Sequence, residues 1–345
     1  MKMQAAQGAA AKKEGANETF APSQRAPSLK KKKKWTLSSV TSLLLALIPL
    51  IGFVLFNGFT LVVSFLVMFC DVDLYDLGSG FDWNNFAGFK AVFIDGWANR
   101  QFALDISKYF YRACGITVWV ASTQFVTLAI ALAISVLLAT KPFGGRVFQI
   151  LFFIPYICSS VAVSIMWKWI FSSDEAGVLN TILGKTVLWT SDPKTMTWTI
   201  VVAIIWQAPG YGIVMYKAAL ANIDKEQYEA AALDGAVGFR KFWYITVPGI
   251  APTTFYLLLA GVNSGLLTYD IAALMIPSGW GSDVGGSENM GLTLMRLVYY
   301  LIGDDVSQLN ASILSSASVI SWVLFAVTAT VAIILFRRRQ KSMEG

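Results

Sequence analysis

Six long stretches without any charged residue constrain this chain more than any other feature of its sequence. A helix needs about 20 residues to cross a bilayer's hydrocarbon core, which is about 30 Å thick. The stretches that meet this length are Trp35–Cys70, Ala113–Thr140, Val147–Trp167, Thr195–Tyr216, Phe242–Tyr269 and Val306–Phe336. Hydrophobic residues make up 56% of the chain and charged residues 14%, too much apolar surface for a soluble core of this size to bury. The sequence therefore predicts an all-α, polytopic membrane protein with six transmembrane helices.

The first apolar stretch is longer than a membrane span and contains Pro49 and Gly52. A lipid-embedded helix tolerates these residues only as a local bend. A secretory signal peptide would have a shorter apolar region followed by a small-residue cleavage site. We therefore expect this stretch to be retained as the first span.

The distribution of lysine and arginine predicts the orientation, because positive flanks resist translocation. With the amino terminus inside, the inner segments hold the basic clusters Lys30–Lys34, Lys141 with Arg146, Lys217 with Lys225, Arg240 with Lys241, and Arg337–Arg339. The outer segments are rich in aspartate and glutamate by contrast. This pattern predicts a membrane protein with both termini in the cytoplasm. The net charge of +6 is then explained by contact with anionic membrane lipid rather than with nucleic acid.

The chain divides into a tail, a membrane domain and a short end segment. Residues 1–35 are rich in Ala, Lys and Gln without apolar periodicity, which predicts a disordered, basic cytoplasmic tail. Residues 36–340 form the six-helix transmembrane domain, and residues 341–345 a short cytoplasmic tail. The third outer segment, Asp270–Asp305, is Gly-rich and is predicted to be a loop.

Three cysteines and a set of outer aromatic residues leave alternatives open. Cys70 and Cys114 both fall near the outer face, where a disulfide is one alternative, although the lack of a multi-cysteine framework favours free thiols. The first outer segment holds Phe81, Trp83, Phe86, Phe89, Phe93 and Trp97. An interfacial aromatic belt is the commoner explanation of such residues, and contact with a sugar or a docking protein is the alternative.

The inner loop between the fourth and fifth spans, residues 221–252, predicts a helix, a turn and a second helix. Asp224 with Gln227 three residues later fits a capping box at the start of a helix over Lys225–Leu233. Asp234 and Gly235 end that helix, since glycine readily takes the left-handed conformation. A basic second helix is expected over Val237–Ile245, before the prolines that open the fifth span. The small side chains of the first helix would let another protein approach closely, so we interpret this loop as a docking element.

The same loop carries a spaced set of residues, namely Glu229, Ala230, Ala231, Gly235, Ile245 and Pro248, with Asp234 and Ala236 beside the glycine. This set resembles the signature of the maltose-transporter-type permeases of carbohydrate ABC importers. The one departure is Val247, where those permeases have Leu. Shorter segments agree with the same family, namely Phe86–Phe89, Gly145-Arg146, and Trp167–Trp169 with Gly177 and Asn180, so the resemblance covers roughly residues 40–339.

The resemblance implies a fold, a role and a set of partners. The fold would be that of a type I ABC importer permease, and the loop over 221–248 would be its coupling helix. Glu229 would contact a basic group on a cytoplasmic ATP-binding subunit, and Gly235 would allow close approach at the turn. The partners would be a second homologous permease, ATP-binding subunits, an extracytoplasmic solute-binding protein and a sugar. The alternative is that Glu229, Ala230 and Ala231 are only good helix formers on a solvated loop.

The sequence also excludes several kinds of chemistry. It contains no histidine, which excludes His-based catalytic triads and zinc-protease motifs. Gly184-Lys185-Thr186 resembles the end of a phosphate-binding loop, but Leu179 occupies the position of its first glycine. No metal-binding spacing occurs. We therefore expect no enzyme activity, no cofactor and no metal in this chain.

Polar residues inside spans four and five are the candidates for a substrate path. They are Gln207 and Tyr211 in span four and Asn263, Ser264 and Thr268 in span five. By resemblance to sugar permeases these two spans would hold the ligand midway across the membrane, while hydrogen bonding between helices explains the same residues equally well. Neutral amides, hydroxyls and rings, without a buried cation, favour an uncharged sugar or oligosaccharide. Asp270 lies near the outer end, where solvation alone would account for it.

The residues thus predict a permease subunit of an ATP-driven importer, which would move a sugar delivered by the binding protein. The rival is a self-sufficient secondary transporter of a small polar solute. Such a transporter would need ion-coupling acids or broken helices near the midplane, and usually an internal repeat. Neither is evident in the sequence.

Overall fold

The computed structural model describes residues 37–71, 80–94, 106–276, 284–303 and 311–344. The predicted tail over 1–35, with its lysine cluster, lies outside the described residues, as do Trp97, Gly279 and Gly281. The chain divides into two compact units, Met1–Gly58 and Phe59–Gly345.

The described part of the first unit is helical. It comprises α2 (Leu37–Phe53) and the π-helical turn η1 (Val54–Gly58). Pro49 lies within α2, and the winding changes only at Val54, so the local adjustment comes after the proline rather than at it. Together with α3 (Phe59–Val67), these residues provide an apolar helix of 24 residues, Leu44–Val67, which is long enough to cross a bilayer.

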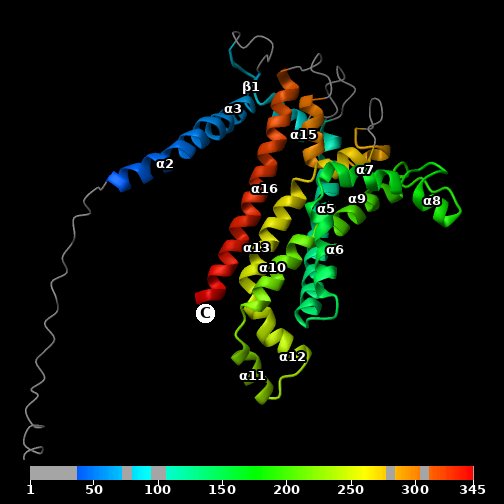
Figure 1. Cartoon of the computed structure of the whole chain (residues 1–345). Coiled ribbons are helices and arrows are strands. Elements are labelled where there is room, and N and C mark those ends of the chain that lie inside the picture. The colour runs from blue at the N-terminus through cyan, green and yellow to red at the C-terminus, as the bar shows by residue number, and fades with distance from the viewer. Residues whose placement is uncertain (1–36, 72–79, 95–105, 277–283, 304–310, 345) are drawn as a thin grey trace, which may run out of the picture. The chain divides into compact units, whose positions relative to one another are not determined.

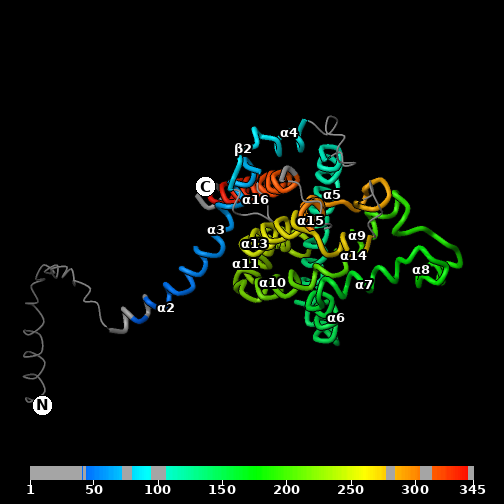
Figure 2. The backbone as a smooth tube through the Cα atoms, turned by 90° about the horizontal axis from the view of Figure 1, so that it is seen from above, coloured from blue at the N-terminus to red at the C-terminus, as the bar shows by residue number. Residues whose placement is uncertain are grey.

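The second unit is a bundle of long apolar helices that run alongside one another (Figures 1 and 2). Its long elements are α5 (Ile106–Ala139), α9 (Pro193–Gln207) with α10 (Pro209–Ala221), α13 (Val247–Leu266) and α16 (Ala311–Glu344). In the described chain five helices are long and apolar enough to cross a membrane, and six if one bent pair counts as a span. The six predicted spans are thus accounted for, although α16 begins at Ala311 and runs on to Glu344.

The third span, predicted over Val147–Trp167, is the bent pair rather than one continuous helix. It consists of α6 (Gly145–Ile157) and α7 (Ser160–Ile170), whose axes differ by 98°. Cys158 and Ser159 between them are extended. Side chains from other helices satisfy hydrogen-bonding groups at the break. Gln207 Nε2 donates to the Cys158 carbonyl at 3.3 Å, and Ser160 Oγ donates to Asp270. Asp270 is therefore a partner of this break rather than a merely solvated carboxylate.

The helix α5 lies at the centre of the packing. It contributes to three clusters of buried apolar side chains, against α15 and α16, against α9 and α14, and against α10 and α13. The small-residue pair Gly261 and Gly265 of α13 faces α5, because a Cβ atom added at Gly265 would lie 2.8 Å from the Ala121 Cα. Small residues four positions apart allow close approach of another helix, and the helix that approaches this pair is α5.

The segment before α5 contains a short hairpin and a short helix. Strand β1 (Cys70–Asp71) pairs antiparallel with β2 (Asp82–Trp83), and α4 (Ala87–Phe93) packs against α16. Phe69, Trp83, Phe86 and Phe89 contact one another through their rings. Cys70, Cys114 and Cys158 are all free thiols, in agreement with the favoured expectation for the first two.

The segment between α7 and α9 forms a small lobe around one buried side chain. It contains α8 (Val178–Leu183), and Figures 1 and 2 both show it extending away from the bundle axis. Asn180 is 2% exposed, and its amide donates to the carbonyls of Ser172, Asp174 and Val187. Its carbonyl oxygen accepts from Val187 N and, at 2.7 Å, from Trp189 Nε1. A single asparagine therefore satisfies five polar groups and holds the lobe together.

The third outer segment is folded, and its prediction as a loop is wrong. It contains α14 (Asp270–Met275), the 3₁₀ turn η4 (Ser287–Asn289) and α15 (Leu294–Gly303). Arg296 is 4% exposed, and it donates to the carbonyls of Ala272, Ile276 and Gly291. Gly285 and Gly286 are buried, whereas residues of a surface loop are usually exposed. A buried arginine therefore fixes this segment, and the expectation that the chain has no buried cation is wrong for this position.

Candidate functional site

The predicted docking loop begins with a helix at the expected residues. Helix α11 runs over Lys225–Leu233, as predicted, with Asp224 at the N-cap position. The predicted capping box is wrong, because the Asp224 side chain accepts no hydrogen bond from the helix. Instead the Gln227 N–H donates to the Asp224 backbone carbonyl at 3.2 Å. The first turn is therefore held by the backbone, and the Asp224 carboxylate contributes only favourable charge at the helix start.

Gly235 closes this helix with two backbone hydrogen bonds. The Ala236 N–H donates to the Ala231 carbonyl at 2.8 Å, and the Gly235 N–H donates to the Ala232 carbonyl at 3.1 Å. This pair of bonds is the Schellman arrangement, which requires a left-handed residue just after the helix. Gly235 has φ of +77°, and no atom of the chain lies within 4 Å of a Cβ added there. Within this chain, glycine is required at 235 for backbone conformation, and the space beside it is open.

The second helix of the loop is continuous with the fifth span. The sequence predicts a separate helix over Val237–Ile245, but helix α12 begins at Phe239 and passes through the π-helical η3 (Phe242–Thr246) directly into α13. Pro248 lies inside this continuous run and has no N–H to donate to the preceding turn. The π-helical turn η3 directly before it is the kind of local adjustment by which a membrane helix accommodates a proline. The Tyr228 hydroxyl lies 3.0 Å from Thr246 Oγ1, and Lys241 Nζ lies 4.8 Å from the Tyr228 ring centre. Helix α11 is thus joined to the base of the fifth span.

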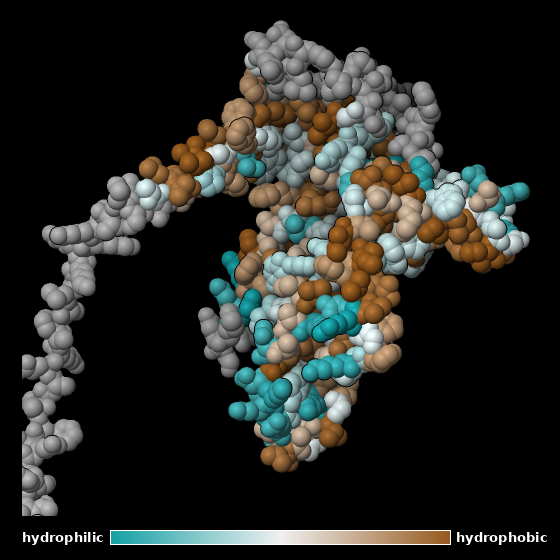
Figure 3. Space-filling view, viewed as in Figure 1, coloured by the Kyte–Doolittle hydropathy of each residue, from teal (hydrophilic) through white to brown (hydrophobic). Residues whose placement is uncertain are grey.

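The residues of the loop differ in their exposure. Glu229, Ala230, Asp234, Gly235 and Pro248 are exposed, Ala236 and Ile245 are half-buried, and Ala231 is buried. Glu229 has no ion pair within the described part of the chain. Beside them Leu233 is 90% exposed, with Val237, Phe239 and Tyr244 also exposed. Figure 3 shows hydrophilic residues gathered at this end of the bundle, with a few hydrophobic ones at its tip. An exposed apolar group on a polar end is typical of a protein-binding surface.

The substrate-path candidates fall into two groups. Tyr211 and Ser264 line one pocket of about 230 Å³ between α5, α6, α10 and α13. The Tyr211 ring stacks on Tyr156 with centroids 5.4 Å apart, and its hydroxyl lies 3.1 Å from the Tyr256 hydroxyl. This pocket presents an aromatic face beside hydroxyl and amide groups.

The other candidates lie elsewhere. Gln207 contacts the break of the third span, and Thr268, just beyond the end of α13, donates from Oγ1 to the Ser264 carbonyl at 3.2 Å. Asn263 lines a separate pocket of about 200 Å³ between α13 and α16, together with Thr328. The five predicted residues are therefore not brought together in one pocket.

The sequence did not point to the remaining polar residues of the Tyr211 pocket. These are Tyr156, Gln124 and Thr127, of which the last two are buried on α5. The available signal was the presence of polar side chains inside the charge-free stretches of spans two and three. No group of metal-binding side chains occurs among the residues that the structure describes.

Comparison with known proteins gives a consistent result. The family model described as binding-protein-dependent transport system inner membrane component matches residues 126–341. A probable ABC transporter permease protein, YesP of Bacillus subtilis (strain 168), is 28% identical over 294 residues, which are 84% of this chain and 86% of the relative. The lactose transport system permease protein LacF of Rhizobium radiobacter is 30% identical over 217 residues, 61% of this chain and 68% of the relative.

The fold also matches a solved structure. A bacterial ABC transporter involved in the import of the acidic polysaccharide alginate has a chain that superposes with a TM-score of 0.66 and 18% identity, covering 87% of this chain and 96% of that one. This similarity supports the six-span importer-permease fold. The family match covers more than half of the chain and includes the docking loop and every lining residue of the Tyr211 pocket except Gln124. The chain therefore belongs to the family of binding-protein-dependent transport system inner membrane components, the permeases of ABC importers.

Proposed function

We propose that this chain is one of two permease subunits of an ATP-driven importer that moves an uncharged sugar or oligosaccharide across the cell membrane. Its partners would be a second homologous permease, cytoplasmic ATP-binding subunits and an extracytoplasmic solute-binding protein. The chain itself would carry out no catalysis. The observation that carries this proposal is the exposed, glycine-closed helix α11, joined side chain to side chain to the base of a membrane span.

The docking loop would transmit closure of the ATP-binding subunits to the membrane domain. Glu229, with no ion pair in the described chain, is available to a basic group of an ATP-binding subunit. The small residues Ala230 and Gly235 would let the helix lie deep in a cleft of that subunit. Movement of α11 would then reach α13 through the Tyr228–Thr246 contact and the unbroken helix from Phe239. Each partner would stabilise one of two alternating-access states.

The orientation follows from the position of the loop. Lys225, Arg240 and Lys241 flank the docking loop, and cytoplasmic segments carry the excess of positive charge. In the proposed orientation, α11 and both termini lie in the cytoplasm and the α14–α15 segment lies outside. The bent third span resembles the broken helices of secondary transporters, but the family match and the docking loop favour the ATP-driven mechanism.

The solute is proposed from the relatives and from the chemistry of one pocket. LacF is named for lactose, and AraP of Bacillus subtilis, which is 30% identical over 182 residues, is named for arabinooligosaccharides. The Tyr211 pocket offers stacked rings with hydroxyl and amide groups and no charged side chain among its lining residues. Such a lining suits a polyol whose ring has one apolar face.

The test is a pull-down from detergent-solubilised membranes with this chain as bait. Wild type is compared with Glu229→Ala and Gly235→Asp, and with Glu175→Ala as a control on an exposed acidic residue far from the loop. We expect wild type and the control to retain a second permease and an ATP-binding subunit, and the two loop variants to lose the latter. A wild-type chain that transports alone in vesicles, with no ATP-binding subunit attached, would establish the secondary-transporter alternative instead.

A further inference from the structure

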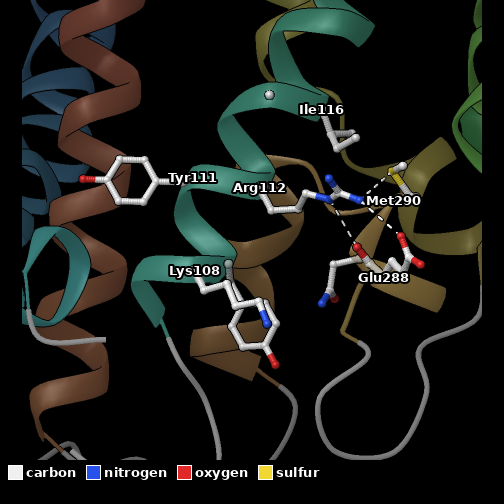
Figure 4. Close-up of a pocket in the computed structure, with 9 residues that line it drawn as sticks. Lys108, Tyr111, Arg112, Ile116, Glu288 and Met290 are labelled. Atoms are coloured by element: carbon white, nitrogen blue, oxygen red, sulfur yellow. Dashed lines mark hydrogen bonds and ion pairs between the residues drawn. The ribbon is translucent and has the colours of Figure 1, made fainter. Parts of the chain in front are cut away.

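We infer that the pocket beside Arg112 and Glu288, at the end of α5 opposite the docking loop, is a second saccharide site that receives the solute before it reaches the Tyr211 pocket. The inference rests on the proposed function. The pocket measures about 790 Å³, within the range of about 300–1,000 Å³ that is usual for small-molecule sites. Figure 4 shows Arg112 reaching from α5 toward Glu288 and Met290, with Tyr111 on the opposite side of the helix.

The rim of this pocket is strained and held by side chains. Glu288 and Asn289 are consecutive non-glycine residues with φ of 51° and 55°. Non-glycine residues take this conformation at a cost, and they concentrate at ligand-binding sites. Arg112 Nε donates to the Glu288 carbonyl at 3.2 Å, and Asn289 Oδ1 accepts from the Gly285 N–H at 2.9 Å. The rim is also tied to the fourth span, because Thr197 Oγ1 donates to the Met290 carbonyl at 2.6 Å.

Arg112 and Glu288 each keep unused hydrogen-bonding capacity. The Arg112 Nη2 contacts the Met290 sulfur at 3.0 Å and lies 3.8 Å from the Glu288 carboxylate, too far for a hydrogen bond. Among the described residues Arg112 Nη1 donates no hydrogen bond, and the Glu288 carboxylate accepts none. Their side chains are 39% and 67% exposed, so both remain accessible to a ligand although they lie close to each other. The pocket therefore presents free donors and free acceptors side by side.

This arrangement selects a class of ligand. A hydroxyl group can donate to a carboxylate and accept from a guanidinium, so two neighbouring hydroxyls of a neutral sugar satisfy both groups at once. Lys108 is the third charged residue that lines the pocket, and it already takes part in an interaction within the structure. An anion would meet Glu288, and a cation would meet Arg112 and Lys108, at distances where like charges repel. Ile116 and Met290 add apolar surface for the carbon face of a sugar ring. A neutral saccharide fits all of these features.

The location of the Arg112 pocket suits a solute-binding step that comes before binding in the Tyr211 pocket. Ile116 borders the Arg112 pocket and Gln124 borders the Tyr211 pocket, both on α5. Eight residues of α-helix separate them, which corresponds to about 12 Å along the axis. In the proposed orientation the Arg112 pocket lies at the outer end, where the binding protein delivers its solute.

The test is calorimetric titration of the complete transporter in nanodiscs, trapped with ADP and vanadate and without the binding protein. Lactose and arabinotriose serve as probes. We expect two classes of sites in wild type, with one weakened about tenfold or more by Glu288→Gln and the other by Tyr211→Ala, as loss of hydrogen bonds to a charged group implies. Glu288→Gly should weaken the same class, because it removes the carboxylate while relieving the strain. Glu175→Gln, a matched change on an exposed residue outside the pocket, should alter neither class.

Several outcomes would overturn the inference. If Tyr211→Ala weakens binding and both Glu288 variants leave it unchanged, the Arg112 pocket is no saccharide site and the proposed function stands. If galacturonate binds more tightly than galactose at the class sensitive to Glu288, the assignment to a neutral ligand is wrong. If the wild-type complex retains its ATP-binding subunits but binds no sugar, both the inference and the sugar assignment fail, while the importer assignment remains.

Discussion

The Tyr228 hydroxyl lies 3.0 Å from Thr246 Oγ1, which joins the exposed helix α11 to the base of the fifth span. Residues 234–238 otherwise connect α11 to α12 as a turn with two left-handed glycines, Gly235 and Gly238. A turn of this kind bends easily, so a contact across it is needed if α11 is to push on α13. In the proposed mechanism, the Tyr228–Thr246 pair is the side-chain contact through which α11 would move α13.

Replacing Tyr228 by Phe should weaken coupling without detaching the ATP-binding subunit. The change removes a hydrogen bond worth about 0.5–1.5 kcal/mol and keeps the ring under Lys241. We expect fewer solute molecules transported per ATP hydrolysed, measured in proteoliposomes with the binding protein. Tyr299→Phe on α15 is the control, because that tyrosine makes a ring contact with Tyr269 but no hydrogen bond through its hydroxyl in the described chain. An unchanged transport-to-hydrolysis ratio would show that the pair does not transmit force.

Substitutions at Gly235 can show whether this position needs glycine for its backbone conformation or for the open space beside it. Asparagine tolerates the left-handed region better than alanine, for which that region costs about 1–2 kcal/mol. If φ of +77° is the requirement, Gly235→Asn should retain more ATP-binding subunit than Gly235→Ala, although asparagine is larger. The readout is the amount of subunit recovered with the purified permease. The reverse order would mean that the partner fills the open space beside Gly235, and that close approach governs this position.

Alanine substitutions at Gly261 and Gly265 can be compared to test how closely α13 packs against α5. An alanine at 265 would place its Cβ 2.8 Å from the Ala121 Cα, so backbones must move apart, at a cost of about 1–3 kcal/mol. An alanine at 261 would approach only Gln124 Oε1, at 3.4 Å, and would gain helix propensity of about 1 kcal/mol. Gly265→Ala should therefore lower the melting temperature in detergent, and Gly261→Ala should leave it unchanged or raise it. Equal loss in both variants would contradict the assigned contact with α5.

The sequence predicted the spans and the α11 helix because both depend on local signals. Apolar runs and charge distribution identify membrane helices, and Asp234-Gly235 ends α11 through backbone preference alone. The 98° bend of the third span could not be predicted in this way. Its stabilising contacts come from Gln207 and Asp270, which are distant in sequence, and the charge-free run Val147–Trp167 continues across the break at Cys158 and Ser159.

The candidate site was predicted only in part for the same reason. Tyr211 was found because it is a polar residue inside a span, but its neighbours Tyr156 and Tyr256 come from two other helices. Asn263 was grouped with it because both are polar residues of adjacent spans. Helix rotation decides which face such a residue occupies, and it places Asn263 toward α16. Rotation depends on packing between helices, which single-sequence patterns do not contain.

Asn180 should be essential to the lobe between α7 and α9. Asn180→Ala would remove the hydrogen bonds that the side chain makes to five polar groups, and we expect a loss of about 3 kcal/mol or more in unfolding free energy. Asn222→Ala is the matched control, because Asn222 is exposed and its side chain makes no hydrogen bond in the described chain. Both would be compared by thermal melting in detergent. A similar melting temperature for the two variants would mean that the lobe does not depend on this side chain.

Tyr211 can distinguish a solute contact from a bond between helices, the two explanations that the sequence leaves open. Tyr211→Phe removes the hydroxyl pair with Tyr256 but keeps the stack on Tyr156, while Tyr211→Ala removes both. If the ring is a platform for a sugar, the Tyr211→Phe variant should transport nearly as well as wild type. The Tyr211→Ala variant should need about a tenfold higher solute concentration for half-maximal transport. Tyr256→Phe is the matched control, since it breaks the same hydroxyl pair and leaves the Tyr211 ring in place. Equal defects in Tyr211→Phe and Tyr256→Phe, with no further loss in Tyr211→Ala, would show that the hydrogen bond between α10 and α13 is what matters.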